Sequence, residues 1–262
     1  MADSSSGEND YFFDTGKYLK TRFSDLTVRD RILFPLECFH DAFQSLPSSL
    51  KVLDYGTGPA IMSVISAAGH ASEIVVSDYA ESNREALRKW LRRDPTAFNW
   101  SPYFDHVVQK LEGKEEKEAR EREERLREVV KDVAYCNINE DPPIRTEYQG
   151  PYDVLIDCVC LTSSCFTKEA FVSGVIKMAA LLKPGGTLLS YSSERKMDSA
   201  TGVYYTGTKP QAVLNTSGEY AVDVLKQHGF SDITLKICKS DVTRPDYDEN
   251  LLGFRFITAV KI

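Results

Sequence analysis

Two glycines and a distant carboxylate form the group of residues best suited to chemistry. The apolar run 50–55 is stopped by the turn at 56–59 (GTGP), and Asp78 ends a second, β-branched run 20 positions beyond Gly58. Glycines let the backbone turn tightly and approach a ligand, while a carboxylate at the tip of the neighbouring strand can accept hydrogen bonds from both ribose hydroxyls. This spacing predicts a nucleoside-binding pocket.

The residues after the turn indicate which nucleoside is bound. Ile61 stands where a dinucleotide fingerprint has its third glycine, and the following segment opens with Pro59. A pyrophosphate needs close approach to a helix N-terminus, whereas a cofactor without phosphates does not. The pattern therefore favours S-adenosyl-L-methionine (SAM) over NAD, and an NAD-dependent oxidoreductase is the less favoured alternative.

Two further strand ends fit the same pocket. Asn137 and Ile138 end a third apolar run, where an amide and an apolar face can hold an adenine, and 157–161 (DCVCL) ends a fourth run that can line the methionine end. Ligands of open parallel sheets bind at the carboxyl ends of the strands, where the strand order reverses. These residues are therefore expected to lie in the same pocket as the glycine turn and Asp78.

The elements that position these residues alternate between strand and helix. Strands are expected at 50–55, 73–78, 133–138, 153–159, 187–191, 233–239 and 255–261, and helices at 60–68, 82–91, 168–182 and 218–228. Such alternation predicts an α/β domain with a mainly parallel sheet covered on both faces. We expect a single domain over 1–262, made of a helical cap over 1–49 and a core over 50–262.

A charged insertion interrupts the core at 112–132. Between 114 and 132, 15 of 19 residues are charged, and an apolar stripe follows from Leu126 onward. Acid-first pairs four residues apart stabilise a helix by roughly 0.2–0.5 kcal/mol each. We expect a solvated helix that docks by its C-terminal half, while its start projects into water. The expected pairs are Glu116/Arg120, Glu118/Arg122, Glu121/Arg125 and Glu123/Arg127.

Composition limits the remaining possibilities. With 262 residues, 42% of them hydrophobic, the chain is long enough for a large core, which excludes disorder as its overall state. A net charge of -7 does not favour nucleic acid as a partner. The N-terminus lacks the pattern of a secretion signal, and no apolar run reaches about 18 residues. Six cysteines without a CxxC pair and four scattered histidines predict reduced thiols and no metal site. We expect a cytoplasmic monomer without a membrane partner.

The sequence resembles the nicotinamide, phenylethanolamine and indolethylamine N-methyltransferase family over nearly its whole length. The blocks that carry the resemblance are 13–19, 54–59, 74–79 with Asn83, 89–91, 97–101 and 181–186. The resemblance implies a Rossmann-like class I methyltransferase with a seven-stranded, mostly parallel sheet, an antiparallel last strand and an N-terminal helical lid. It also implies SAM as cofactor, S-adenosyl-L-homocysteine as product, and a small-molecule methyl acceptor.

That acceptor is expected to be the nitrogen of a small amine or pyridine, of nicotinamide-like, aryl-ethylamine-like or pyridine carboxylate type. Related enzymes act on thioethers, so S-methyl transfer is an alternative. A pyridine nitrogen needs no base at pH 7, whereas an alkylamine must lose a proton. Glu194 and Asp246 are the candidate catalytic bases.

The resemblance also implies which residues bind the cofactor. Tyr18 corresponds to the lid tyrosine, Asp78 to the ribose acceptor and Tyr79 to the ring that stacks on adenine. The expected set is Tyr18, Phe23, Gly56, Thr57, Gly58, Met62, Asp78, Tyr79, Asn83, Asn137, Ile138 and Cys158. Several members depart from the family pattern: Phe23 and Met62 replace tyrosines, Asn137-Ile138 replaces Asp-Val, and Cys158 replaces a small residue.

The acceptor side departs further from the family pattern. Ser192 falls where nicotinamide-type members carry an aspartate that holds the carboxamide, Thr162 replaces an acidic or similar polar residue, and the segment 192–217 is longer than its family equivalent. Nicotinamide is therefore expected to be a poor acceptor. The expected acceptor contacts are Tyr18, Thr162, Ser192, Glu194, Tyr204, Tyr205, Asp246 and Tyr247.

Overall fold

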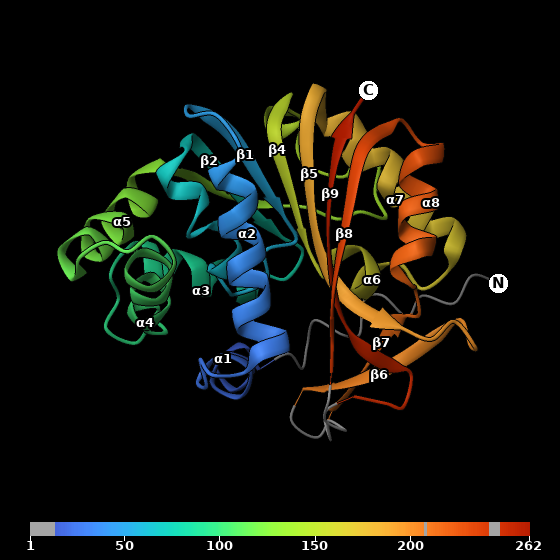
Figure 1. Cartoon of the computed structure of the whole chain (residues 1–262), viewed down its shortest axis with the longest axis horizontal. Coiled ribbons are helices and arrows are strands. Elements are labelled where there is room, and N and C mark those ends of the chain that lie inside the picture. The colour runs from blue at the N-terminus through green and yellow to red at the C-terminus, as the bar shows by residue number, and fades with distance from the viewer. Residues whose placement is uncertain (1–13, 207–208, 241–246) are drawn as a thin grey trace.

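A seven-stranded sheet runs through the computed structural model, which describes residues 14–206, 209–240 and 247–262 (Figure 1). The strands in spatial order are β3 (Val130–Tyr135), β2 (Ala71–Asp78), β1 (Leu50–Tyr55), β4 (Tyr152–Cys158), β5 (Leu182–Arg195), β9 (Leu251–Lys261) and β8 (Phe230–Lys239). Only β9 runs antiparallel to its neighbours; the other pairs in the sheet are parallel. The prediction of a mostly parallel sheet with an antiparallel last strand is confirmed.

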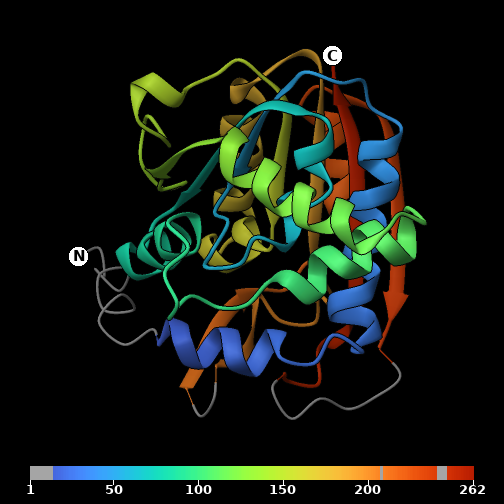
Figure 2. The same cartoon turned by 90° about the vertical axis from the view of Figure 1, so that its left-hand side faces the viewer.

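The strand order reverses at β1, and this reversal locates the crevice in which ligands bind. Asp54 of β1 pairs with Val76 of β2 on one side and with Ile156 of β4 on the other, both in parallel register. The carboxyl ends of these three strands therefore meet at one edge of the sheet. Figures 1 and 2 place the N-terminal helix α1 (Thr15–Phe23) at this same edge.

Helices cover both faces, as expected for buried parallel strands. One core cluster lies under the N-terminal helices α1 and α2 (Phe34–Gln44), the π-helical turn η2 (Arg29–Leu33) and α3 (Glu81–Leu91). In it the ring of Phe39 meets Phe256 edge-on, with 4.9 Å between ring centroids. The predicted helical character of the N-terminal cap is confirmed in the described part of the chain.

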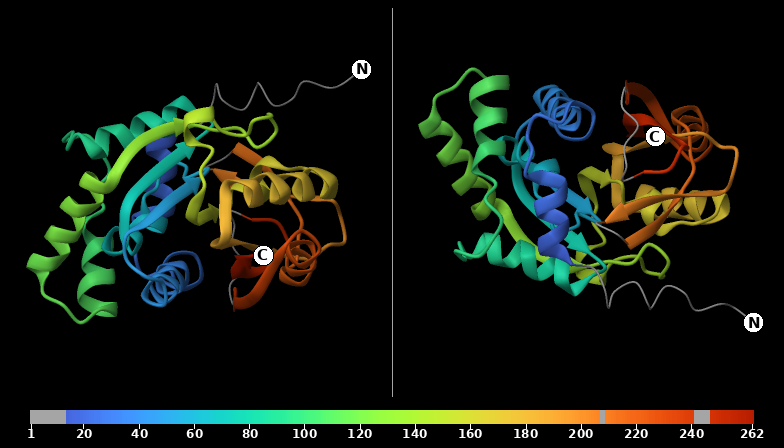
Figure 3. Two further views of the ribbon diagram at one scale, coloured as in Figure 1. Left: turned by 90° about the horizontal axis from the view of Figure 1, so that it is seen from above. Right: turned by 90° about the horizontal axis from the view of Figure 1, so that it is seen from below.

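The second core cluster lies under the helices of the opposite face. These are α6 (Cys160–Ser164), α7 (Lys168–Leu181) and α8 (Gly218–Gln227). Figure 3 shows α7 and α8 at the end of the molecule away from the charged helix α5 (Glu116–Val129). The 3-10 turn η6 (Thr146–Tyr148) precedes β4. No helix in the described ranges is long and apolar enough to span a bilayer.

The helix expected at 60–68 is not an α-helix. The chain forms two 3-10 turns there, η3 (Met62–Val64) and η4 (Ala67–Gly69). The stretch contains three β-branched residues, which favour helix less than straight-chain residues do. The Ser63 hydroxyl also donates to the Asp54 carboxylate, and residues 61–68 are all buried. Burial on every side removes the need for one apolar helix face, so side-chain contacts decide the local conformation.

Several strand predictions differ from the structure in extent. The strand expected at 187–191 spans 182–195, and those expected at 233–239 and 255–261 begin three and four residues earlier. The strand expected at 133–138 occupies 130–135, because α5 ends at Val129 and the chain enters the sheet directly. Asn137 and Ile138 therefore lie in the loop after β3. The long segment 192–217 contains two unpredicted antiparallel strands, β6 (Thr201–Thr206) and β7 (Lys209–Leu214), which pair with each other to form a hairpin.

The charged insertion is a helix, but less of its start projects into water than expected. Of the four predicted pairs only Glu123/Arg127 forms, at 2.7 Å, while Arg122 instead pairs with Glu112 at 2.9 Å. Ala119, in the first half of α5, is fully buried. The helix packs against α4 (Ser101–Asp105) and the π-helical turn η5 (His106–Leu111). The helix therefore docks from Ala119 onward, while Glu116 and Lys117 at its start are exposed as predicted. Local pairs such as Lys117/Glu121 and Arg125/Glu128 form in place of three of the predicted ones.

Candidate functional site

The glycine turn after β1 is held against the end of β2. Gly56 and Gly58 have φ of +70° and +66°, and the N–H of Thr57 donates to the Ser77 carbonyl at 2.8 Å. A Cβ on Gly56 would lie 2.2 Å from Sγ of Cys160, whereas a Cβ on Gly58 would meet no atom within 4 Å. Glycine is thus required sterically at the first position, and the second faces open space into which a ligand can approach.

Asp78 is the carboxylate toward which this turn points. Its Oδ2 accepts from the Gly58 N–H at 2.8 Å, and its Oδ1 accepts from Ala80 N–H at 2.9 Å and from the Asn83 amide at 3.0 Å. Burial raises the pKa of Asp78, and these hydrogen bonds oppose that shift. A carboxylate offers about four acceptor positions, so three donors fix its orientation and leave Oδ2 able to accept from a ligand hydroxyl.

Asn83 extends this network to the N-terminal helix. Its Oδ1 accepts a hydrogen bond of 3.2 Å from the hydroxyl of Thr15, the first residue of α1. The chain of contacts Thr15, Asn83 and Asp78 therefore connects the lid to the nucleoside side of the site. The sequence predicts Asn83 at this position but gives no signal for Thr15.

The predicted adenine region contains a partly exposed ring. The side chain of Tyr79 is 39% exposed, and its ring lies 5.9 Å from that of Tyr135. The Asn137 oxygen already accepts from the Asn139 N–H at 3.0 Å, and one acceptor position remains. Ile138 is buried against α7 near Gly174, so its side chain belongs to the core instead of facing a ligand.

Asp54 belongs to the block 54–59 that the sequence marks out, but no role is predicted for it there. It is fully buried, the Ser63 hydroxyl donates to its Oδ2, and its Oδ1 has no hydrogen-bond partner among the described residues. Burial raises the pKa of Asp54 to about 7. Its charge suits a cationic group such as the ammonium of SAM, but the oxygen is closed to a ligand in this conformation, so such a contact would require the adjacent glycine turn to shift. Its position immediately before the turn was the available signal.

The end of β4 turns sharply into the site. Val159 has φ of +69°, which is rare for a β-branched residue, and its N–H donates to the Tyr191 carbonyl at 2.7 Å. Strained backbone of this kind gathers at functional sites. The turn leaves Cys158 half-buried and starts α6, which carries Thr162. Burial raises the pKa of the Cys158 thiol well above its ordinary value, so the thiol stays protonated at pH 7.

Two predicted acceptor contacts bind each other. The hydroxyls of Thr162 and Ser192 lie 2.8 Å apart, and both residues are buried. This pair carries no charge.

Glu194 has partners that give it a structural role. Its Oε2 accepts from the N–H of Gly218, at the start of α8, at 2.7 Å and lies 3.5 Å from the buried Arg255 guanidinium. Burial raises the pKa of Glu194, and Arg255 and the Gly218 N–H oppose that shift. These contacts argue against Glu194 as the catalytic base. Asp246, the other candidate base, lies outside the described residues.

The acceptor side is lined by tyrosines from distant parts of the chain. The ring centroids of Tyr204 in β6 and Tyr247 lie 6.2 Å apart, and the two rings stack. Burial raises the pKa of Tyr18 on α1, and electrostatic interactions with Tyr204 and Tyr247 raise it further. The structure thus places Tyr18, Tyr204 and Tyr247 in one region. The Tyr205 ring is 37% exposed, and this residue contributes its carbonyl instead.

Arg22 lies among these tyrosines and was not anticipated. Its guanidinium carbon is 5.6 Å from the ring centroid of Tyr204 and 5.0 Å from that of Tyr247. It donates to the Tyr247 hydroxyl at 3.1 Å and to the Tyr205 carbonyl at 2.8 Å. The available signal was its spacing of four residues from Tyr18, which places both side chains on one face of a helix.

Phe23 and Met62 occupy the core. Phe23 is buried and meets the rings of Trp100 at 5.3 Å and Tyr18 at 5.9 Å, and Met62 is also buried. Neither side chain is open to a ligand in this conformation. Phe23 instead packs edge-on against the ring of Tyr18.

Helix α1 spans the two halves of the site. Thr15, Tyr18 and Arg22 follow the spacing of one helix face, and seven residues of helix extend about 10 Å. Thr15 reaches the Asp78 network, and Arg22 reaches the hairpin. Figures 1 and 2 both show α1 beside β6 and β7 at the same edge of the sheet.

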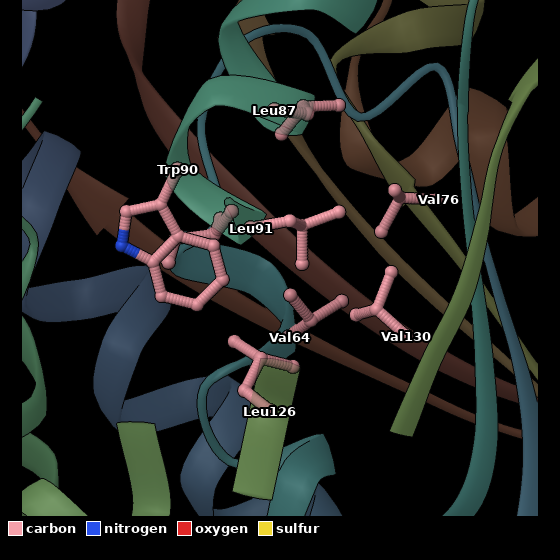
Figure 4. A pocket seen from close by; sticks show the side chains of 8 residues that line it. Val64, Val76, Leu87, Trp90, Leu91, Leu126 and Val130 are labelled. Atoms are coloured by element: carbon pink, nitrogen blue, oxygen red, sulfur yellow. The ribbon is translucent and has the colours of Figure 1, made fainter. Parts of the chain in front are cut away.

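An apolar cavity elsewhere in the molecule is not part of this site. It has a volume of about 10 Å³ and is lined by Ile61, Val64, Val76, Leu87, Trp90, Leu91, Leu126 and Val130 (Figure 4). That volume holds about one water molecule at most, and apolar cavities of this kind stay dry. It is a packing gap between α3, α5 and the sheet.

The chain matches a known family over almost its entire length. The match to the NNMT/PNMT/TEMT family covers residues 5–262. Individual relatives include nicotinamide N-methyltransferase of Homo sapiens, 33% identical over 69% of this chain and 66% of that protein. Phenylethanolamine N-methyltransferase of Macaca mulatta is 34% identical over 74% of this chain and 68% of that protein, and indolethylamine N-methyltransferase of Mus musculus is 27% identical over 95% and 93%.

Alignments with several relatives are partial. The chain spans 58% of the nicotinamide N-methyltransferase of Sus scrofa and 61% of the indolethylamine N-methyltransferase of Oryctolagus cuniculus. Among solved structures, a SAM-dependent methyltransferase of Methanosarcina mazei superposes with a TM-score of 0.57 at 13% identity, covering 85% of this chain and 97% of that one. A Burkholderia thailandensis 1,6-didemethyltoxoflavin-N1-methyltransferase with bound S-adenosylhomocysteine gives 0.54 at 16% identity, covering 100% and 91%. The fold is that of class I methyltransferases.

Proposed function

This chain belongs to the NNMT/PNMT/TEMT family, and we propose that it transfers a methyl group from SAM to the nitrogen of a small amine or pyridine. The observation that carries the proposal is the glycine turn, which is hydrogen-bonded to Asp78 and lies beside the unpaired oxygen of Asp54. These two carboxylates suit the ribose and the ammonium of SAM, and no third glycine is present for a pyrophosphate.

The residues at the turn would hold SAM, which supplies a methyl group on a cationic sulfur. Asp78 would accept from the ribose, Tyr79 would stack on adenine, and the charge of Asp54 would favour the ammonium. The half-buried Cys158 at the end of β4 would border the methionine chain. Because burial keeps its thiol protonated, Cys158 does not compete as a nucleophile for the methyl group.

The chain's main contribution to catalysis is positioning. The acceptor nitrogen and the methyl carbon must be held in line at about 3 Å, with water excluded. Helix α1 suits this task because it contacts both halves of the site, through Thr15 and through Arg22. Charge moves from sulfur to nitrogen during transfer, so no covalent help from the protein is needed.

The acceptor side favours something other than nicotinamide. The buried Thr162 and Ser192 hydroxyls form an uncharged pair, so a carboxamide would lack a charge-assisted hydrogen bond worth roughly 1.5–3 kcal/mol. The names of the relatives suggest three classes to compare, namely pyridines, aryl-ethylamines and indolethylamines. All six cysteines are free thiols, which fits the proposed cytoplasmic location.

Two linked measurements test this function. SAM is expected to raise the melting temperature, and NAD is not, because a ligand that binds only the folded state stabilises it. Release of S-adenosylhomocysteine is then followed with pyridine, aryl-ethylamine and thioether acceptors. If NAD raised the melting temperature as much as SAM does, the assignment of SAM as the cofactor would be rejected. If only thioethers were methylated, the acceptor atom would be sulfur and not nitrogen.

A further inference from the structure

We infer that Arg22 is a positioning residue that holds the β6–β7 hairpin in place on the acceptor side of the site. The inference rests on the proposed N-methyl transfer for the role of that side. Arg22 is 4% exposed and lies one helical turn after Tyr18 on α1. Its guanidinium donates to the Tyr205 carbonyl at 2.8 Å and to the Tyr247 hydroxyl at 3.1 Å. One side chain therefore bonds the N-terminal helix to β6 and to the segment that carries Tyr247.

The hairpin needs support from outside itself. β6 and β7 form a two-stranded sheet that is separate from the seven-stranded sheet of the core (Figure 1). A two-stranded hairpin alone is marginally stable at best in water. The position of its side chains therefore depends on the contacts that attach it to the rest of the molecule.

The base of the hairpin is attached by a buried polar cluster. Arg195 at the end of β5 is fully buried, its Nε donates to the Asn215 oxygen at 2.6 Å, and it forms an ion pair with Asp248. Asp248 also accepts from the backbone N–H of Val203 in β6. A Cβ on Gly202 would collide with the Arg195 and Asp248 side chains, so β6 passes this cluster at a glycine. The base is thus tied to the main sheet.

The outer half of the hairpin is more exposed, and Arg22 attaches it. Tyr205 is 37% exposed, whereas Leu214 at the base is 1% exposed. The Arg22 guanidinium carbon lies 5.6 Å from the ring centroid of Tyr204 and 5.0 Å from that of Tyr247. A cation within about 6 Å of a ring centroid is attracted to the ring face. Arg22 therefore binds this half through two rings as well as through the Tyr205 carbonyl.

Helix α1 is a fixed support for Arg22, because the next residue belongs to the core. Phe23 is buried, and its ring centroid lies 5.3 Å from that of Trp100. The Phe23 carbonyl accepts from the Tyr103 hydroxyl at 2.9 Å. Arg22 therefore connects a helix end anchored in the core to the outer half of the hairpin.

Loosening the hairpin should change acceptor binding and not cofactor binding. An acceptor binds productively only while Tyr204 and Tyr247 are in place, so its apparent affinity falls with the fraction of molecules in that state. SAM would bind at the carboxyl ends of β1 and β2, in the other half of the site. The loss should also be the same for every acceptor, whatever its charge, because Arg22 acts through the hairpin.

Hydrogen–deuterium exchange in the full-length protein tests the position of the hairpin directly. Arg22→Met removes the hydrogen bonds of a charged donor and should speed exchange in the outer half, at 204–206 and 209–211, about ten- to a hundredfold. Amides at 213–214 and in β4 should exchange as in the native protein. Arg22→Lys should give an intermediate rate because it keeps the charge but loses the planar fork. Unchanged exchange in Arg22→Met, or an equal increase throughout the chain, would overturn the inference.

Steady-state kinetics with SAM supply the second readout. Arg22→Met should raise KM several-fold for both pyridine-3-carboxylate and 2-phenylethylamine, while kcat and SAM affinity stay within a few-fold. Lys20→Met is the matched control, since Lys20 is an exposed cation on the same helix, and it should change none of these values. An unchanged KM, or a loss confined to one acceptor, would overturn the positioning role and leave N-methyl transfer intact. If neither acceptor is methylated, the proposed function fails, while exchange still decides whether Arg22 holds the hairpin.

A double-mutant cycle assigns the effect to the contact between Arg22 and Tyr247. Tyr247→Phe keeps the ring and removes the hydroxyl that accepts from Arg22. Alone it should speed exchange in the outer half a few-fold, and in the Arg22→Met background it should add no further change. Effects of the two substitutions that simply multiply would show that the side chains act separately, which would overturn the inference.

Discussion

The cofactor half and the acceptor half of the site are built by different means. The first is made largely of backbone and strand ends between Asp54 and Asn83, with the turn N–H groups bonded to Ser77 and Asp78. The second is assembled from side chains of α1, β5, β6 and the segment at Tyr247, which are distant in sequence. Substitutions in the acceptor half can therefore change the acceptor that binds while the cofactor half continues to bind the same cofactor.

The largest expected effect lies in the acceptor half, at Glu194. Glu194→Gln leaves the buried Arg255 without its carboxylate, which should lower the free energy of unfolding by about 3 kcal/mol. Because we assign this residue a structural role, the pH profile of kcat should not move. Urea unfolding and steady-state kinetics measure the two quantities. Loss of the acidic limb of the profile would identify Glu194 as the base after all.

Asp78 should control cofactor affinity alone. Asp78→Ala removes a charged acceptor from a partly enclosed site and should weaken SAM binding by about 1.5–3 kcal/mol in calorimetry. Asp41→Ala is the control, since Asp41 is an exposed carboxylate on α2. Unchanged SAM affinity in Asp78→Ala would show that another group receives the ribose.

Asp54 should contribute to binding at the expense of stability. Its pKa is raised from 3.8 to about 7 by burial, so between these pH values the unfolded state loses the proton and the folded state keeps it. Stability therefore falls as pH rises through this window. Asp54→Asn should unfold like the native protein at pH 4 and be more stable by about 1–2 kcal/mol at pH 8, while binding SAM more weakly. Denaturant unfolding at both pH values, with calorimetry for SAM, measures these effects. If Asp54→Asn and the native protein had the same free energy of unfolding at pH 8, Asp54 would not carry a destabilising buried charge.

The smallest expected effect concerns the junction between the halves. Thr15→Val removes the hydroxyl that reaches Asn83, and one neutral hydrogen bond is worth about 0.5–1.5 kcal/mol. SAM affinity should fall by only a few-fold, and Thr15→Ser should restore it. If both variants bind SAM like the native protein, the lid is not coupled to the ribose side.

The same contrast explains what the sequence could predict. The strand alternation and the glycine turn are local patterns, and the sheet order and the contact between Gly58 and Asp78 follow from them. Arg22 and the partners of Glu194 depend on packing between segments that no spacing rule connects. The 3-10 turns over 62–69 were missed for a related reason, because burial on all sides outweighed the helical pattern.

Methyl transfer itself is tested most directly with SAM labelled with carbon-13 at its methyl group and the pyridine carboxylate acceptor. The account predicts that the label appears on the ring nitrogen, seen by NMR, in equal amount to the S-adenosylhomocysteine formed. At SAM concentrations below its weakened Kd, Asp78→Ala should move the label more slowly, in proportion to its lower occupancy. Label that stays on SAM with every nitrogen acceptor, or that appears only on a thioether sulfur, would contradict it.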